Sequence, residues 1–167
     1  MSAALDPAGW RAPEPFIWTV TARDEDVDAF GHVNNAVYSR WQDRCAWAHS
    51  AADGLTAAVC AETRRGVALI EARLSFRKPV LSGDALAVGV WIAAVERGLK
   101  AERWFQIRRR HDGATVFESR CFYVCIELDT GKPARMPKAF LAHYRANPHI
   151  TEAEAALPVP APGSEGY

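Results

Sequence analysis

The chain of 167 residues is the size of one domain, and its 49% hydrophobic content is enough to form a core. The 20 Lys and Arg residues balance the 20 Asp and Glu residues, so no net charge draws the chain toward nucleic acid or anionic membranes. No apolar run approaches the roughly 20 residues that span a bilayer, and the N-terminus lacks the features of a secretory signal. We therefore expect a cytoplasmic protein that binds neither nucleic acid nor membranes.

The chain is expected to contain one folded domain, residues 15–147, between a flexible leader (1–14) and a flexible, Pro-containing C-terminal tail (148–167). Residues 16–21 are predicted to form a strand, and residues 35–52 a long helix. The helix is apolar over much of its circumference, so it needs cover on most sides. A single sheet that curls around the helix would supply that cover.

Four further segments predict long strands joined by short turns: 67–76, 85–95, 99–110 and 114–128. In the first of them, the even positions are apolar and alternate with Glu71, Arg73 and Ser75, which predicts a strand with one buried face. The short connection Glu96-Arg97-Gly98 is suited to a hairpin. Strands linked in this way form an antiparallel sheet. Pro137 is suited to the first turn of a final helix.

The cysteines and histidines give no sign of a metal or a cofactor. The four cysteines lack metal-ligand spacing and are expected to be buried, reduced and apolar in character. Cys121 and Cys125 would lie on one face of a strand, roughly 13 Å apart, which is too far for a disulfide. The five histidines are scattered, so we expect no metal site. A Ser-His-Asp hydrolase is not expected, because the Gly-x-Ser-x-Gly elbow is absent from the sequence.

The most informative segment is Asp28-Ala29-Phe30-Gly31-His32-Val33-Asn34-Asn35-Ala36-Val37-Tyr38, just before and into the predicted long helix. A carboxylate near the free N–H groups of a helix N-terminus can attack a carbonyl or activate water against it. Those N–H groups can hold the developing oxyanion. The segment therefore indicates acyl transfer to water.

The same segment, Asp-x-x-Gly-His-Val-Asn-Asn-x-x-Tyr followed by Arg40-Trp41, resembles the signature of hotdog-fold acyl thioesterases. These are the relatives of 4-hydroxybenzoyl-CoA thioesterase and of acyl-carrier-protein thioesterases. The resemblance implies an α+β hotdog fold, in which an antiparallel sheet wraps around one long central helix. It also implies a homodimer or homotetramer with active sites at subunit interfaces, and an acyl-CoA or acyl-carrier-protein substrate.

By this resemblance Asp28 is the nucleophile or the general base, although an Asp in this position also commonly caps a turn. His32 matches a histidine that is counted as catalytic in the plant acyl-carrier-protein thioesterases; its other reading is a histidine that braces the loop. The predicted oxyanion and substrate-binding residues are Gly31, Asn34, Asn35, Ala36 and Val37. The two asparagines are also well suited to helix N-capping.

Two departures separate the chain from the plant enzymes. Phe30 stands where their motif has Asn, and Ser75 stands near the position of their later glutamate. The simpler arrangement of the bacterial acyl-CoA group therefore fits better. Glu71 is a second carboxylate candidate, although strand alternation points it toward solvent.

Basic residues for the phosphates of coenzyme A are Arg77 and Lys78, which are equally compatible with a solvated strand end. On the helix, Arg40 and Asp43 have the spacing of an ordinary surface ion pair.

The sequence therefore predicts a thioesterase that hydrolyses an acyl-CoA or acyl-carrier-protein thioester to free acid and thiol. The alternative is a hotdog protein that binds acyl thioesters without hydrolysing them.

Overall fold

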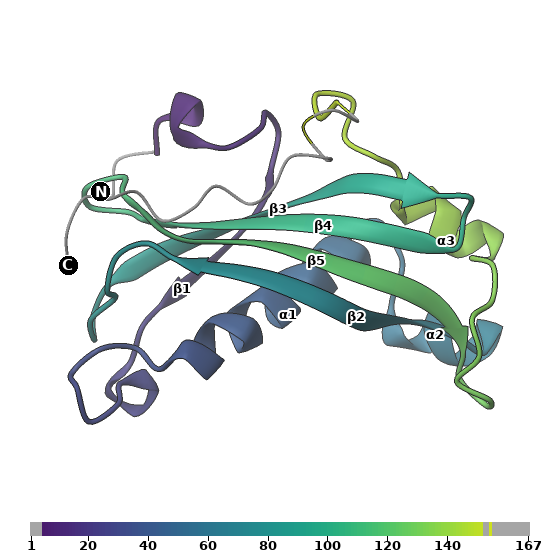
Figure 1. Ribbon diagram of the computed structural model, residues 1–167, viewed down its shortest axis with the longest axis horizontal. Coiled ribbons are helices and arrows are strands. Elements are labelled where there is room, and N and C mark those ends of the chain that lie inside the picture. The colour runs from purple at the N-terminus through teal and green to yellow at the C-terminus, as the bar shows by residue number, and fades with distance from the viewer. Residues whose placement is uncertain (1–4, 152–153, 155–167) are drawn as a thin grey trace.

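A computed structural model describes residues 5–151 and residue 154. It contains one antiparallel sheet of five strands with a long helix against it (Figure 1). The elements in chain order are η1 (Pro7–Gly9), β1 (Phe16–Thr21), η2 (Asp24–Asp26), α1 (Asn35–Ala52), α2 (Ala57–Thr63), β2 (Arg65–Phe76), β3 (Ala85–Glu96), β4 (Lys100–Arg109), β5 (Thr115–Glu127) and α3 (Lys138–His143).

The strands lie in the order β1-β3-β4-β5-β2, and every neighbouring pair is antiparallel. The predicted hairpin joins β3 to β4, and its tight turn places Arg97 at φ 50° and Gly98 at φ 61°. Two successive positive φ angles are the mark of a turn whose twist matches that of the flanking strands. The predicted antiparallel sheet is confirmed, and β3, β4 and β5 form a meander, but β2 pairs with β5 and not with β3, the next strand in the chain.

Helix α1 lies along one face of the curled sheet, and the sheet bends around it (Figure 1). The helix buries one side against the strands, and the main core forms there from aromatic and branched aliphatic side chains. Its largest fully buried members are Trp41, Phe105, Phe117, Leu86 and Ile107. This arrangement confirms the predicted hotdog architecture.

The opposite face of the sheet is covered in part by residues 5–14, which fall within the predicted flexible leader. The Arg11 N–H donates to Gln106 Oε1 at 2.7 Å. The Trp10 ring packs against Gly89 so closely that a Cβ there would meet the ring at 2.6 Å. Residues 1–4 and nearly all of the predicted tail beyond residue 151 lie outside the described residues.

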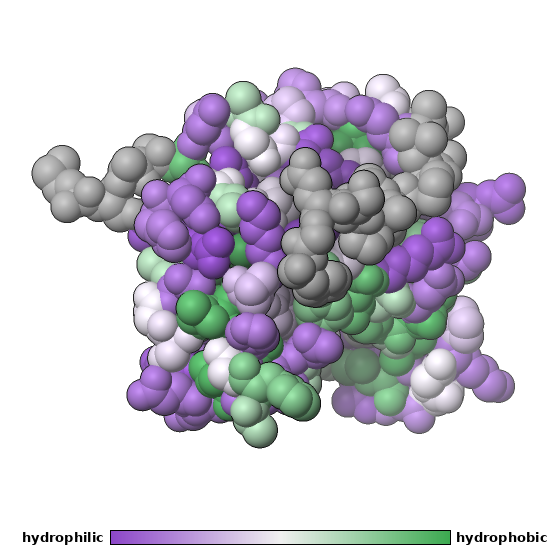
Figure 2. Space-filling view, turned by 60° about the vertical axis from the view of Figure 1, so that its left-hand side comes forward, coloured by the Kyte–Doolittle hydropathy of each residue, from purple (hydrophilic) through white to green (hydrophobic). Residues whose placement is uncertain are grey.

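Strand β2 is an edge strand, and its predicted burial was wrong. Leu69, Ile70 and Leu74 are 54%, 57% and 42% exposed, and the register shifts at Leu69/Glu71. The bulge breaks the alternation, and the strand lies at the margin of the sheet, where α1 gives little cover. Figure 2 shows hydrophobic surface lying among the hydrophilic side chains.

Helix α2 was not predicted from the sequence. The Val59 N–H donates to the Thr56 side chain, which caps its N-terminus, and the helix ends at Arg64 with φ 52°. Its seven residues are too few for a clear hydrophobic period. No helix within the described residues is both long and apolar enough to cross a membrane.

Candidate active site

The loop from Asp28 to His32 is a compact turn that fixes the Asp28 carboxylate. The Asp28 N–H donates to the His32 carbonyl at 2.8 Å, and the Gly31 N–H donates to the Asp28 carbonyl at 3.0 Å. Gly31 has φ 81°, a conformation that glycine adopts without a steric penalty. Asp28 Oδ1 accepts the Phe30 N–H at 2.8 Å, which is the turn-capping contact considered for this residue. Asp28 is half-buried, and its Oδ2 has no hydrogen bond from any described residue.

The N-terminus of α1 follows directly and is capped by Asn34. Asn34 Oδ1 accepts the Ala36 N–H at 2.9 Å, and the Asn34 carbonyl accepts the Val37 N–H at the same distance. Two of the predicted oxyanion donors are therefore already engaged in the cap. The Asn35 N–H has no hydrogen-bond partner among the described residues. It is the amide that remains available to a ligand at this helix end.

A cavity of about 310 Å³ opens beside this helix end. It brings together side chains that are distant in the sequence: one group comes from the loop and the start of α1, the other from the end of β2 and the residues after it. Its lining residues are His32, Val33, Asn35, Tyr38, Phe76, Arg77, Lys78 and Pro79. The structure thus places His32 and Asn35 in one cavity with both predicted phosphate-binding residues. Asp28 does not line it but belongs to the same loop as His32.

Two aromatic side chains, Tyr38 and Phe76, line the cavity. Tyr38 is 3% exposed; its ring packs edge-on against Phe76 at 5.2 Å between ring centroids and lies tilted against Phe117 at 5.1 Å. Burial raises the pKa of Tyr38 to about 12, with the negative charge of Asp84 acting in the same direction. Its hydroxyl is therefore protonated at neutral pH, and this aromatic lining is uncharged.

The two basic residues of the cavity differ in availability. The Arg77 guanidinium forms an ion pair with Glu118 at 2.8 Å, and both side chains are largely buried. Lys78 is exposed at the rim. Lys78 is therefore the more accessible of the two positive charges, while Arg77 is held by its ion pair with Glu118.

Other sequence-derived candidates lie elsewhere. Arg40 bonds to Asp26 at 2.6 Å, so the expected surface pair of Arg40 with Asp43 was wrong. Asp26, before α1, is buried and pairs with Arg40, whereas Asp43 on the helix is exposed. Glu71 pairs with Arg73 at 2.8 Å on the exposed face of β2, as expected for a strand residue that points toward solvent. The Phe30 side chain, beside Asp28, is 87% exposed.

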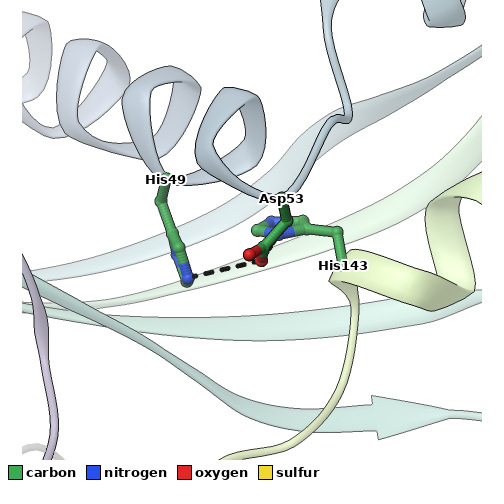
Figure 3. A group of neighbouring side chains, drawn as sticks. All are labelled: His49, Asp53 and His143. Carbon is green, nitrogen blue, oxygen red and sulfur yellow. Dashed lines mark hydrogen bonds and ion pairs between the residues drawn. The ribbon is translucent and has the colours of Figure 1, made fainter.

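A second cluster of polar side chains lies at the C-terminal end of α1, where the sequence predicted no site. His49 and Asp53 come from the end of the helix, and His143 comes from α3 (Figure 3). Their ligand atoms lie within 4.8 Å of one another, the only such group of three within the described residues. His143 Nδ1 lies 2.7 Å from Asp53 Oδ2, so this pair is already satisfied by a hydrogen bond. No spacing in the sequence relates His143 to residues about 90 positions earlier.

Solved structures of similar fold include several thioesterases. A 1,4-dihydroxy-2-naphthoyl-CoA thioesterase from Synechocystis matches with TM-score 0.71 and 17% identity, over 78% of this chain and 96% of its own. A hypothetical protein from Staphylococcus aureus, solved in complex with CoA, matches with TM-score 0.76 and 17% identity, over 89% and 96%. A probable thioesterase from Escherichia coli matches with TM-score 0.66 and 19% identity, over 78% and 99%. At these identities the likeness shows the fold.

No curated protein sequence matches the chain significantly. The family model for the thioesterase-like superfamily matches residues 22–144, which is more than half of the chain and includes both the Asp28 loop and the cavity. The chain therefore belongs to the thioesterase-like superfamily.

Proposed function

We propose that this protein hydrolyses acyl-CoA thioesters, with Asp28 as the nucleophile or general base. The observation that carries the proposal is the junction between the loop and α1. There the Asp28 carboxylate has one oxygen without a hydrogen bond, and the Asn35 N–H at the adjoining helix N-terminus is likewise without a partner, both among the described residues. The partial positive charge of a helix N-terminus favours the oxyanion that forms when a thioester carbonyl is attacked.

The cavity next to this junction provides room for the thioester. His32 and the Asn35 N–H face the reacting end in this proposal, and Lys78 at the rim meets a phosphate of coenzyme A. Among the solved structures of similar fold, the Staphylococcus aureus protein is in complex with CoA and the Synechocystis protein is a CoA thioesterase. That supports acyl-CoA as the first substrate class, with acyl-carrier-protein thioesters as the second class to test.

The active unit in this proposal is a homodimer or homotetramer. Within the described part of the chain, strand β2 has no neighbouring strand on its outer side, and its Leu69, Ile70 and Leu74 side chains are exposed. An open apolar edge is a template for pairing with another strand. Pairing with a second copy would cover it, and Ile70→Lys is expected to shift the molar mass measured by light scattering toward the monomer.

The decisive experiment is thiol release from short, long and aromatic acyl-CoAs by the wild-type chain, Asp28→Asn and Asp28→Ala. Loss of a positioned acid or base lowers kcat by about 10²–10⁴-fold. Asn retains an oxygen that can accept the Phe30 N–H, so the loop is expected to survive in Asp28→Asn. Glu25→Gln is the matched control, because Glu25 is an exposed carboxylate just ahead of the loop that pairs with Arg23 at 3.5 Å.

Near-wild-type turnover by Asp28→Asn would refute the assigned mechanism. Intact recovery of every bound thioester after long incubation, from both CoA and carrier-protein panels, would refute hydrolysis and favour the acyl-binding alternative.

A further inference from the structure

A second cavity, of about 260 Å³, lies between α1, α2, β2 and α3, away from the Asp28 loop. Its wall is largely apolar and is formed by Trp47, Leu55, Val67, Tyr123, Leu128 and Phe140. Its volume is slightly below the range of about 300–1,000 Å³ typical of pockets for drug-sized ligands. A small ligand with an apolar body therefore fits it.

Arg103 of β4 brings a buried charge to this apolar wall. Arg103 is 2% exposed. Its Nη1 donates to the Ala46 carbonyl at 3.1 Å, and its Nη2 lies 3.0 Å from each of Ser50 Oγ, His143 Nε2 and Tyr144 Oη, which share the two N–H groups of that nitrogen. All four acceptors are uncharged groups, because burial keeps the Tyr144 pKa above and the His143 pKa below their usual values.

The positive charge of Arg103 therefore has no counter-ion. None of the ion pairs between described residues includes Arg103. The rings of Tyr123 and Tyr144 lie 5.8 and 5.2 Å from its guanidinium carbon, which gives only a weaker cation–π attraction. A buried charge without a partner is destabilising by several kcal/mol, so such groups are commonly paired or serve a site.

Arg103 also has a donor to spare. Its Nε is buried and has no hydrogen-bond partner among the described residues. Unsatisfied buried donors are rare in native proteins, and each calls for an explanation. A carboxylate that entered the cavity would supply the missing counter-charge, and one of its oxygens would be the acceptor that Arg103 Nε lacks.

The negative charge at the cavity opening limits the charge that a ligand can carry. Asp43 lines the same cavity and is exposed. A second negative charge on the ligand would meet this carboxylate at the opening. A ligand with one negative charge at its buried end and a neutral apolar remainder therefore fits best.

We propose that this cavity binds a monocarboxylate with a short apolar body, a medium-chain or aryl carboxylate, through its carboxylate group and Arg103. The site is separate from the cavity beside Asp28. The inference stands whether or not the chain hydrolyses thioesters.

The test compares octanoate with octanamide, which has nearly the same shape but no charge, by calorimetric titration of the full chain. Octanoate is expected to bind at least about tenfold more tightly, because a charge-assisted hydrogen bond to a guanidinium is stronger than a neutral one. Arg103→Met should remove this preference. Arg108→Met is the matched control: Arg108 is 4% exposed on the same strand, but its guanidinium bonds the Asp6 and Gly113 carbonyls instead.

A second measurement needs no variant. Cys60 lines the cavity and is half-buried, while Cys45, Cys121 and Cys125 are buried elsewhere and serve as internal controls. Burial raises the pKa of the Cys60 thiol, so alkylation by iodoacetamide is followed near pH 9 by mass spectrometry. Octanoate is expected to slow the alkylation of Cys60 several-fold, and octanamide is not.

Equal binding of the two ligands, or a preference for octanoate that persists in Arg103→Met, would overturn the proposal. If Arg103→Met does not fold, the alkylation of Cys60 in the wild-type chain tests the proposal by itself. Protection by octanoate alone supports the site, and equal or absent protection refutes it.

Discussion

Arg103 Nη2 lies 3.0 Å from His143 Nε2, and this contact fixes the protonation state of the histidine. An arginine has donors but no acceptor, so Nε2 must be the unprotonated nitrogen. The proton of the neutral ring is then on Nδ1, 2.7 Å from Asp53 Oδ2, and is donated to that carboxylate. The chain Arg103–His143–Asp53 ties β4, α3 and the end of α1 together at a point far from the Asp28 loop.

This chain of contacts predicts an energetic coupling between His143 and Asp53. His143→Ala is expected to destabilise the fold by about 1–3 kcal/mol, because it removes an acceptor from buried Arg103. A double-mutant cycle with Asp53→Asn, measured by urea denaturation, should give a coupling energy of about 0.5–3 kcal/mol. His111→Ala is the control, since His111 is exposed and lies 3.8 Å from its partner Asp112. Strict additivity in the His143–Asp53 cycle would contradict the coupling.

The neighbouring His49 predicts a pH-dependent loss of stability. Its side chain is 18% exposed and stacks on Phe16 at 4.9 Å. Burial, with His143 and Arg103 acting in the same direction, lowers the pKa of His49 from 6.5 to about 4. In the unfolded chain the His49 side chain therefore binds a proton below about pH 6.5, whereas in the folded chain it binds one only below about pH 4.

The free energy of unfolding should consequently fall as the pH drops through this window and level off below it. At about 1.4 kcal/mol per pKa unit, the loss attributable to His49 is roughly 3 kcal/mol. His49→Gln should flatten the dependence measured by urea denaturation from pH 7 to about pH 4. An unchanged slope in this variant would show that His49 is not the titrating group.

The helix cap at Asn34 predicts a joint effect on stability and turnover. Asn34→Ala removes the acceptor of the Ala36 N–H and should cost about 1 kcal/mol of stability. It also loosens the helix end that presents the Asn35 N–H, so kcat should fall while KM for acyl-CoA changes little. Asn34→Asp keeps a capping oxygen and should restore the melting temperature. If Asn34→Ala melts earlier but turns over normally, the Asn35 N–H does not hold the oxyanion.

The exposed Lys78 predicts a dependence on the phosphates of coenzyme A. Lys78→Ala should raise KM for acyl-CoA about two- to fivefold with kcat retained, since an exposed ion pair contributes about 1 kcal/mol or less. Hydrolysis of an acyl-pantetheine without phosphates should be unaffected. Lys138→Ala, an exposed lysine at the start of α3, is the control. An equal loss with both substrates would refute a phosphate contact.

The local features of the candidate site were predictable from the sequence. The Asp28 motif, the Asn34 cap and the start of α1 all arise from residues within about two turns of one another, where turn and cap preferences act directly. The hairpin at Gly98 was predictable for the same reason. Predictions about Arg40 and about the buried face of β2 failed, because they depended on partners outside the local segment.

The sequence by itself determined the succession of strands, the apolar helix that needs a sheet around it and the loop chemistry at its N-terminus. Short-range preferences and hydrophobic periodicity encode these features. The tertiary structure alone decided which residues share a cavity: Lys78 with His32, and Arg103 with Ser50, His143 and Tyr144. These groupings join residues 40 or more positions apart, and only the folding of the sheet over α1 brings their side chains within hydrogen-bond or cavity distance.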